Sequence, residues 1–395
     1  MKRTLSWLVA GALSLTALAG CSGTTAPSSA AGGGAAAGGD TVKVGLLFEL
    51  TGNVASYGTA EANGAKMAAE EINAAGGVNG KKIQLVEYDT KSDTAETTTL
   101  AAKLMTQDKV VAIIGPATSG GMKAQIQLSA QNKVPIVSGS ATADDLTVTN
   151  GKLNEYVFRT CFVDSYQGTV MAKYAASKLN AKTAVILKDT SSDYAKGLAD
   201  AFDKQFKAGG GTVAATEAYT AKQTDFNAVL TKLKGQQFDV MYVPGYYEEL
   251  GLIIKQARAL GITAPITGGD GYESPKLAEL AGSALTDVYY TNHYSATDTD
   301  PKVTAFIDAF KKKYNNATPE AFHALGYDTM KFVADSIKRA KSATGADVKA
   351  AMTETKGFSG VTGTFDVDPA THNPIKQATI IGYKDGKISV TEKFS

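Results

Sequence analysis

A short stretch in the first half of the chain reads VVAIIGPATSGG, at residues 110–121. Its first five residues are apolar and rich in Val and Ile, which predicts a buried strand over 110–114. A loop of small residues follows, and Ser119 stands at or near the start of the next predicted helix. A buried strand, a Gly-containing loop and a helix in this order are typical of a parallel α/β sheet.

The same alternation of strands and helices extends from this stretch to both sides. Strands with helix-sized connections are predicted at 42–48, 83–88, 134–137, 184–187, 238–243, 264–266 and 287–290. After these come helices at 301–313, 321–340 and 346–355, and a final pair of strands at 379–384 and 388–394 around Asp385-Gly386. The pattern predicts two doubly wound α/β sheets, each with its own core.

Length and composition agree with two globular lobes. The chain has 395 residues, of which 44% are hydrophobic and 20% charged. Single cores usually stop growing near about 250–300 residues, so more than one domain is expected. Lys+Arg (40) and Asp+Glu (39) nearly balance, which argues against a strongly basic nucleic-acid-binding protein.

The N-terminus has the features of an export signal. Lys2 and Arg3 precede a mostly apolar run at 5–18, which is shorter than the roughly 20 residues that a membrane-spanning helix needs. The run ends in LAGC at 18–21, which resembles the bacterial lipoprotein signal motif and predicts lipid on Cys21. The alternative is an ordinary secretory signal with an incidental Cys.

The segment after this signal predicts a tether. Residues 22–39 are only Ser, Gly, Thr, Ala and Pro, which cannot build a core. We therefore expect a signal peptide at 1–20 and a lipidated Cys with a flexible linker at 21–41. Cys161 then remains alone in the body, and its apolar surroundings at 157–162 favour a buried strand residue over a reactive thiol.

Sequence motifs for catalysis are absent. No Gly-rich nucleotide-phosphate motif, no H-E-x-x-H and no G-x-S-x-G occur, and the three His residues, His293, His323 and His372, are scattered. The sequence predicts no catalytic residue, no metal site and no cofactor.

Polar groups do follow three predicted strands, where α/β domains bind ligands. Ser119 at a helix start offers a hydroxyl beside free N–H groups. The loop SGSAT at 138–142 brings small residues, Ser140 and Ala141 among them, and the Thr142 hydroxyl. Asp270 stands between glycines after strand 264–266. Each alone has an ordinary explanation: a helix cap, a small-residue loop and a turn.

Together these groups predict a ligand with two opposite charges. Hydroxyls and N–H groups in the first half suit a carboxylate, and the Asp270 carboxylate suits an ammonium, which points to an α-amino acid. We expect Tyr57, Tyr194 and Tyr246 to line the ligand-binding cleft, because each side chain offers an apolar face and a hydroxyl.

In order and spacing, residues 42–395 resemble the branched-chain amino-acid (Leu/Ile/Val) binding proteins of ABC importers, which have the type I periplasmic-binding-protein fold. The motifs that carry the resemblance are Gly45 through Thr51-Gly52, Tyr57-Gly58, Gly64-Ala65, residues 72–80 (INAAGGVNG), Asp89, Ile114-Gly115, residues 164–168 (DSYQG), residues 194–197 (YAKG), Asp225-Phe226, Tyr246 and Gly326-Tyr327-Asp328.

The resemblance implies a role for each matching residue. Ser119 and Thr142 would contact the ligand carboxylate, the backbone around Ser140 and Ala141 would help to fix the charged groups, and Asp270 would pair with the ammonium. The cleft would be lined by Tyr57, Tyr194 and Tyr246, and Phe322 would touch the ligand side chain. Three positions depart from familiar members: Asp270 replaces a Glu, Thr118 a half-cystine, and Ala117 a larger apolar residue.

The resemblance also implies an organisation and a function. The chain would cross between lobes near 161, 291 and 362, giving a first lobe of 42–161 with 292–362 and a second of 162–291 with 363–395. It would be a monomeric, extracytoplasmic, membrane-anchored lipoprotein that captures an amino acid, branched-chain or aliphatic, for an ABC permease. The alternative is a ligand-sensing receptor of the same fold for amino acids, amides or urea; an enzyme is disfavoured because no nucleophile–base motif is present.

Overall fold

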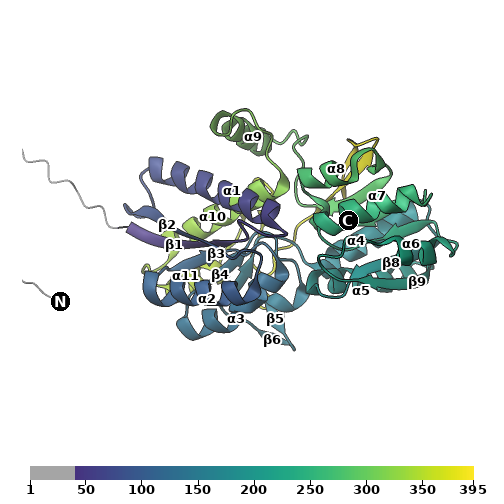
Figure 1. Cartoon of the computed structure of the whole chain (residues 1–395). Coiled ribbons are helices and arrows are strands. Elements are labelled where there is room, and N and C mark those ends of the chain that lie inside the picture. Colours follow the sequence, from purple (N-terminus) through teal and green to yellow (C-terminus); the bar gives the residue numbers. More distant parts are fainter. Residues whose placement is uncertain (1–40) are drawn as a thin grey trace, which may run out of the picture. The chain divides into compact units, whose positions relative to one another are not determined.

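The computed structural model describes residues 41–395, which fold into two α/β lobes (Figure 1). The first lobe is built on a five-stranded sheet and the second on a seven-stranded sheet. The predicted signal peptide, Cys21 and all but the last residue of the predicted linker lie outside the described residues.

The first sheet is parallel throughout, in the order β2-β1-β3-β4-β7. Alternate residues of β1 point to opposite faces: Val44 and Leu46 pack in one core cluster and Leu47 in another. Helices α1 (Ala55–Ala74) and α10 (Ala321–Arg339) cover the first face, and α2 (Thr94–Lys103) and α3 (Ser119–Asn132) the second. The strands are β1 (Thr41–Phe48), β2 (Lys82–Asp89), β3 (Ala112–Ile114), β4 (Ile136–Ser138) and β7 (Val157–Arg159).

The close approach of α1 and α10 depends on two glycines. A Cβ at Gly64 would lie 1.9 Å from the His323 carbonyl oxygen, and a Cβ at Gly326 would lie 2.1 Å from that of Glu61. Two helices from distant parts of the chain therefore form one layer. The lobe is completed by α9 (Pro301–Lys313), α11 (Gly345–Thr353) and the small pairs β5 (Val148–Thr149) with β6 (Lys152–Leu153) and β13 (Phe358–Gly360) with β14 (Gly363–Phe365).

The second sheet has the order β16-β15-β12-β11-β10-β8-β9. Strands β8 to β12 pair in parallel, whereas β15 and β16 extend the sheet as antiparallel strands. The strands are β8 (Thr183–Asp189), β9 (Thr212–Tyr219), β10 (Val240–Tyr242), β11 (Ile266–Gly268), β12 (Val288–Asn292), β15 (Ala378–Lys384) and β16 (Lys387–Phe394). The helices are α4 (Asp164–Ser177), α5 (Asp193–Ala208), α6 (Asn227–Lys234), α7 (Tyr247–Ala259) and α8 (Pro275–Ala281).

The chain passes between the two sheets three times. Residues 160–163 join β7 to α4, residues 293–300 follow β12 and lead to α9, and residues 366–377 join β14 to β15. These three segments touch one another: Phe162 stacks on His293, and Lys376 Nζ donates to the Thr160 carbonyl at 2.9 Å. They provide a connection about which two lobes can open and close.

Most predicted elements are present, with some differences at their ends. Helix α1 forms the predicted connection between the first two strands, and β11 lies two residues later than predicted. Strand β9 was not predicted, because it is an edge strand of alternating exposure without an apolar run. Cys161 lies two residues beyond β7, not within a strand, but it is buried, and burial raises the pKa of its thiol to about 12.

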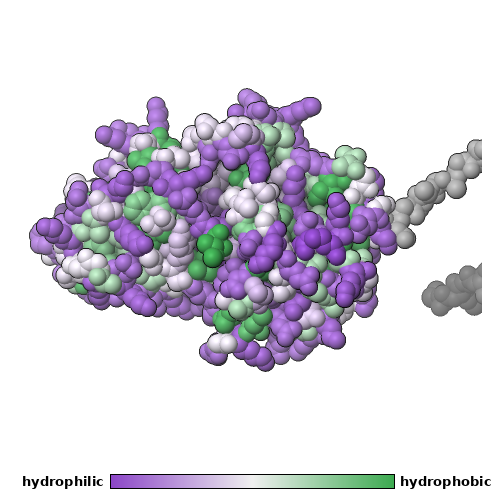
Figure 2. Space-filling model, turned by 180° about the vertical axis from the view of Figure 1, so that it is seen from behind, coloured by the Kyte–Doolittle hydropathy of each residue, from purple (hydrophilic) through white to green (hydrophobic). Residues whose placement is uncertain are grey.

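The surface is mainly hydrophilic. Figure 2 shows small, separate hydrophobic areas on the face seen from behind. Among residues 41–395, the large hydrophobic side chains that are exposed are Ile375 and Ile388. No helix in this part of the chain is both long and apolar enough to cross a membrane.

Candidate functional site

The C-terminal ends of the parallel strands of both lobes meet around a small cavity. It lies between residues of the first lobe and residues of the second. The lining residues are Tyr57, Ala117, Thr118, Ser119, Ser140, Tyr194, Tyr246, Asp270, Gly271 and Phe322. These positions are far apart in the sequence, so the fold alone brings them together.

Seven of the nine predicted ligand-binding residues line this cavity, and two lie behind it. The Ala141 carbonyl accepts a hydrogen bond from Arg159 Nη1 at 3.1 Å, and the Thr142 carbonyl accepts one from the Asp164 amide at 2.9 Å. The Thr142 hydroxyl is buried and faces Asp164 without a well-formed hydrogen bond. The loop that carries Ala141 and Thr142 therefore supports the cavity, while Ser140 reaches its surface.

The first-lobe wall is built around the start of α3. Thr118, not Ser119, is the N-cap, because its hydroxyl accepts a hydrogen bond from the Gly121 amide at 3.3 Å. Ser119 is the first helical residue, and its Oγ accepts from the Ala143 amide at 3.1 Å. The Ser119 hydroxyl proton therefore remains available to a group in the cavity.

Glu49 holds the loop before α3 in place. Its carboxylate accepts hydrogen bonds from the Ala117 amide at 3.0 Å, the Thr118 amide at 3.1 Å and the Thr118 hydroxyl at 2.7 Å. Burial raises the pKa of Glu49, while these donors oppose that shift. The sequence analysis did not name Glu49, although it follows β1 directly and the strand-end rule could have found it.

Glu61 lies behind Ser140 on α1. Glu61 Oε1 and Ser140 Oγ are hydrogen-bonded, and Ser140 Oγ also donates to the Ala117 carbonyl at 2.8 Å. Burial raises the pKa of Glu61 to about 8. A protonated Glu61 can donate to Ser140, which frees the single Ser140 proton for Ala117. Glu61 comes from the middle of a helix, so no strand-end pattern marks it.

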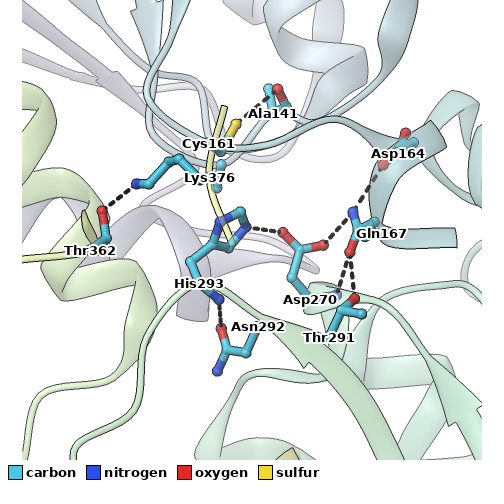
Figure 3. A network of polar contacts seen from close by, with 12 residues as sticks. Ala141, Cys161, Asp164, Gln167, Asp270, Thr291, Asn292, His293, Thr362 and Lys376 are labelled. Carbon is cyan, nitrogen blue, oxygen red and sulfur yellow. Dashed lines mark hydrogen bonds and ion pairs between the residues drawn. The ribbon is translucent and has the colours of Figure 1, made fainter. Parts of the chain in front are cut away.

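The second-lobe wall carries Asp270 in a buried hydrogen-bond network (Figure 3). Asp270 Oδ1 accepts from Tyr194 Oη at 2.8 Å and from Gln167 Nε2 at 3.2 Å. Asp270 Oδ2 lies 2.8 Å from His293 Nε2. Asp270 and Tyr194 are predicted from the sequence, whereas no sequence pattern marks Gln167 or His293 as part of the site.

Aromatic side chains close the cavity from both lobes. The Tyr57 ring stacks on Phe322 at a centroid distance of 4.5 Å, and Tyr194 stacks on Tyr246 at 5.2 Å. Tyr57 Oη donates to the Gly271 carbonyl at 2.5 Å and accepts from the Tyr247 amide at 3.1 Å. Tyr57 is thus both a wall of the cavity and a bridge between the lobes.

The chain matches the family described as "Periplasmic binding protein" over residues 41–387. It belongs to that family. This confirms the expected type I fold and places the protein among extracytoplasmic solute-binding proteins rather than enzymes.

Named relatives of this binding protein cover most of its length. It is 36% identical over 309 residues to the Leu/Ile/Val-binding protein BraC3 of Rhizobium johnstonii, covering 78% of this chain and 82% of that protein. It is 34% identical over 330 residues to a leucine-, isoleucine-, valine-, threonine- and alanine-binding protein of Pseudomonas aeruginosa, covering 83% and 86%.

Two solved structures of binding proteins are also similar to this chain. The branched-chain amino acid transporter substrate-binding protein LivJ of Streptococcus pneumoniae, in complex with isoleucine, is 43% identical with a TM-score of 0.84, covering 90% of this chain and 99% of that one. The leucine-binding protein LivK of Thermotoga maritima is 32% identical with a TM-score of 0.84, covering 90% and 98%.

Three further contacts join the lobes of this binding protein at the cleft. Lys123 of α3 lies 2.8 Å from Asp193 of α5, and the Ser56 and Ser274 hydroxyls are 2.8 Å apart. Asp144 accepts from the Ser165 amide at the start of α4 at 2.9 Å. Among residues 41–395, no group of three or more His, Cys, Asp or Glu side chains could hold a metal ion.

Proposed function

We propose that the protein is the substrate-binding component of an ABC importer and that it captures an amino acid, branched-chain or aliphatic, between its lobes. The observation that carries the proposal is the pairing of two unlike walls around one cavity. One wall offers hydrogen-bond donors at a helix start, and the other offers the Asp270 carboxylate. A zwitterion satisfies both walls at once.

The ligand carboxylate would bind at the start of α3. The Ser119 hydroxyl lines the cavity and keeps its proton available, and Thr142 supports the same region from behind. A helix N-terminus favours an anion because its first N–H groups point outward and the helix dipole is positive there. Backbone near Ser140 and Ala141 would complete this half of the site.

The ligand ammonium would bind at Asp270. Three donors already hold this carboxylate, and a carboxylate has about four lone-pair directions, so one remains for the ligand. The ligand side chain would lie against Tyr57, Tyr194, Tyr246 and Phe322, which present apolar ring faces. Ala117 leaves room on the same side for a branched chain.

Ligand binding would be coupled to closure of the two lobes. We assign β1 to β7 with α9 to β14 to the first lobe and α4 to β12 with β15 and β16 to the second, moving about the three crossover segments; the third crossover begins after β14, at residue 366, rather than near 362. The ligand can favour closure only through contacts that it makes better in the closed form than in the open form. Tyr57 of the first lobe bonds to Gly271 and Tyr247 of the second lobe. These protein contacts would also stabilise the closed form.

The closed, monomeric protein would deliver its ligand to a membrane permease while lipid on Cys21 holds it at the membrane. Several acyl chains on one Cys anchor firmly, whereas a single chain binds only marginally. Cys21→Ala should release the protein from membranes into the soluble fraction. Retention of this variant on washed membranes would contradict lipid anchoring.

Titration calorimetry of the protein, freed of bound solute by unfolding and refolding, tests the proposal. Leucine, isoleucine and valine are compared with alanine, phenylalanine, acetamide and urea. We expect saturable heat with the branched-chain amino acids. Absence of saturable heat with every amino acid would overturn the proposal, and binding of urea or acetamide alone would favour the sensing alternative.

A further inference from the structure

His293 makes the one hydrogen bond to Asp270 Oδ2 among residues 41–395. We propose that His293 is a positioning residue of the ammonium site: it fixes the direction of the Asp270 carboxylate and leaves its negative charge available to the ligand. This inference rests on the proposed function, because it takes Asp270 as the partner of the ligand ammonium.

The imidazole is held firmly from two sides. Its Nε2 lies 2.8 Å from Asp270 Oδ2, and the two side chains are only 1% and 4% exposed. The ring also stacks on Phe162, with centroids 3.6 Å apart and planes 19° from parallel. A ring held in this way can define where its hydrogen-bond partner points.

The net charge of the His293–Asp270 pair also decides whether the pair can attract an ammonium. Burial lowers the pKa of His293 and outweighs the hydrogen bond and charge of Asp270, which act in the opposite direction, so the neutral ring is favoured. A neutral ring with its proton on Nε2 donates to Asp270 and leaves Nδ1 as a bare acceptor, which agrees with Nδ1 having no hydrogen-bond partner. The pair then keeps one net negative charge for an ammonium; a protonated ring would cancel it.

The remaining contacts of Asp270 come from the other oxygen. Gln167 Nε2 and Tyr194 Oη both donate to Oδ1. Gln167 is itself fixed, because its Oε1 accepts from the Thr291 hydroxyl at 2.8 Å and its Nε2 donates to Asp164 at 3.0 Å (Figure 3). Because both of these hydrogen bonds go to Asp270 Oδ1, only His293 is left to fix the orientation of Asp270 Oδ2.

The same ring connects the ammonium site to the crossover segments. His293 is the first residue of the second crossover, and Phe162, on which it stacks, belongs to the first. Asp270 is therefore fixed against the part of the molecule about which the lobes would turn. Loss of the imidazole should affect ligands that carry an ammonium and spare those that do not.

Binding of leucine and of its des-amino analogue 4-methylpentanoate tests this inference by calorimetry, with competition titrations for weak binders. In the wild type, leucine should bind much more tightly than the analogue. In His293→Leu, the ratio of the two dissociation constants should fall at least tenfold, because only the ammonium contact is weakened. His293→Gln, whose amide can still donate to Oδ2, should restore most of the ratio.

Two further variants separate a loss of the ammonium contact from a general loss of folding. His372 is also buried and stacks on a Phe, Phe158, at 4.0 Å, so His372→Leu should leave the ratio within twofold. If His293→Leu does not fold, His293→Asn replaces it, since its shorter amide should not reach Oδ2. An unchanged ratio, or an equal loss for both ligands, would overturn the inference while leaving the proposed function intact. A wild type that binds no amino acid would overturn both.

Discussion

The two walls of the cleft use their hydrogen-bond donors in opposite ways. On the first-lobe wall, the Ser119 hydroxyl accepts a hydrogen bond from within the protein and keeps its proton free. On the second-lobe wall, Tyr194, Gln167 and His293 all direct their donors at Asp270. The Ser119 hydroxyl proton on the first wall is therefore available to a ligand anion, whereas three side chains on the second wall already contact the Asp270 carboxyl group.

Two of the buried carboxyl groups, Glu61 and Asp270, sharpen this contrast. Glu61, behind the first wall, has one side-chain partner, Ser140, and an Oε2 without any partner, and burial raises its pKa to about 8. Asp270, in contrast, has three side-chain partners, Tyr194, Gln167 and His293. Burial therefore favours a neutral acid behind the first wall, whereas the carboxyl group on the second wall is surrounded by polar side chains.

The largest loss of ligand affinity is expected when the carboxyl group of the second wall is replaced. Asp270→Asn should weaken leucine binding by about 100- to 5,000-fold, since leaving a buried charge without its partner costs about 3–5 kcal/mol. Calorimetric titration measures the loss. Asp203→Asn, which alters a surface pair with Lys207, is the control and should bind as the wild type does. Near-wild-type affinity in Asp270→Asn would contradict the ammonium assignment.

Removing a donor from the first wall should have a smaller effect. Ser119→Ala should weaken leucine binding by about 10- to 100-fold, because a hydrogen bond to a charged group contributes about 1.5–3 kcal/mol. Binding of 3-methylbutylamine, which lacks the carboxylate, should change little. Ser129→Ala on the same helix, whose hydroxyl bonds to the Ile126 carbonyl, is the matched control. Equal losses for both ligands would show that Ser119 acts only in folding.

The neutral acid behind the first wall predicts a pH dependence of stability. Folded Glu61 holds its proton up to about pH 8, whereas the ordinary pKa of a Glu carboxyl group is 4.5. Its contribution to stability is therefore full below about pH 4.5 and is lost as the pH rises toward 8, by on the order of 1–3 kcal/mol. Glu61→Gln should lose less unfolding free energy than the wild type between pH 5 and pH 8.

Urea unfolding at several pH values measures this difference. Glu70→Gln, on the same helix but with an exposed side chain, is the control and should follow the wild type. If the free energy of unfolding changes with pH in the same way in Glu61→Gln and in the wild type, Glu61 is ionised in the folded protein. The first wall would then have no neutral acid behind it.

The smallest effect is expected where a charged pair links the two walls. Lys123 Nζ lies 2.8 Å from Asp193 across the cleft, and Lys123 lowers the pKa of Asp193. Both side chains are partly exposed, and such pairs contribute about 0.2–1 kcal/mol, so Lys123→Gln should weaken leucine binding at most about fivefold. The difference should shrink at high salt. Lys207→Gln, in a pair within one lobe, should change nothing.

Much of the fold could be predicted because it depends on local patterns. The apolar runs marked most strands, and Asp385-Gly386 forms the predicted turn, with positive φ values of 51° and 73°. Ser119 and Asp270 were found because each follows a strand of a parallel sheet. Tyr57 and Phe322 could be placed at the cavity only through resemblance, since Tyr and Phe on a helix usually pack in a core.

The supporting residues could not be predicted from patterns. Gln167 and Asp270 are 103 residues apart, and Glu61 and Ser140 are 79 apart. Gln167 and Glu61 lie within helices, where polar residues are ordinarily solvated. Only their burial in the folded protein gives them a function.

The sequence by itself determined the two α/β lobes and which loops lie at their strand ends, because hydrophobic periodicity and turn residues act over short distances. The tertiary structure decided which polar groups surround each buried carboxyl group, and with it which wall suits an ammonium. A buried carboxyl group can serve a ligand only if the side chains around it hold it in place and leave one of its lone pairs free. Those side chains, His293 and Gln167 among them, reach Asp270 only when distant segments pack together.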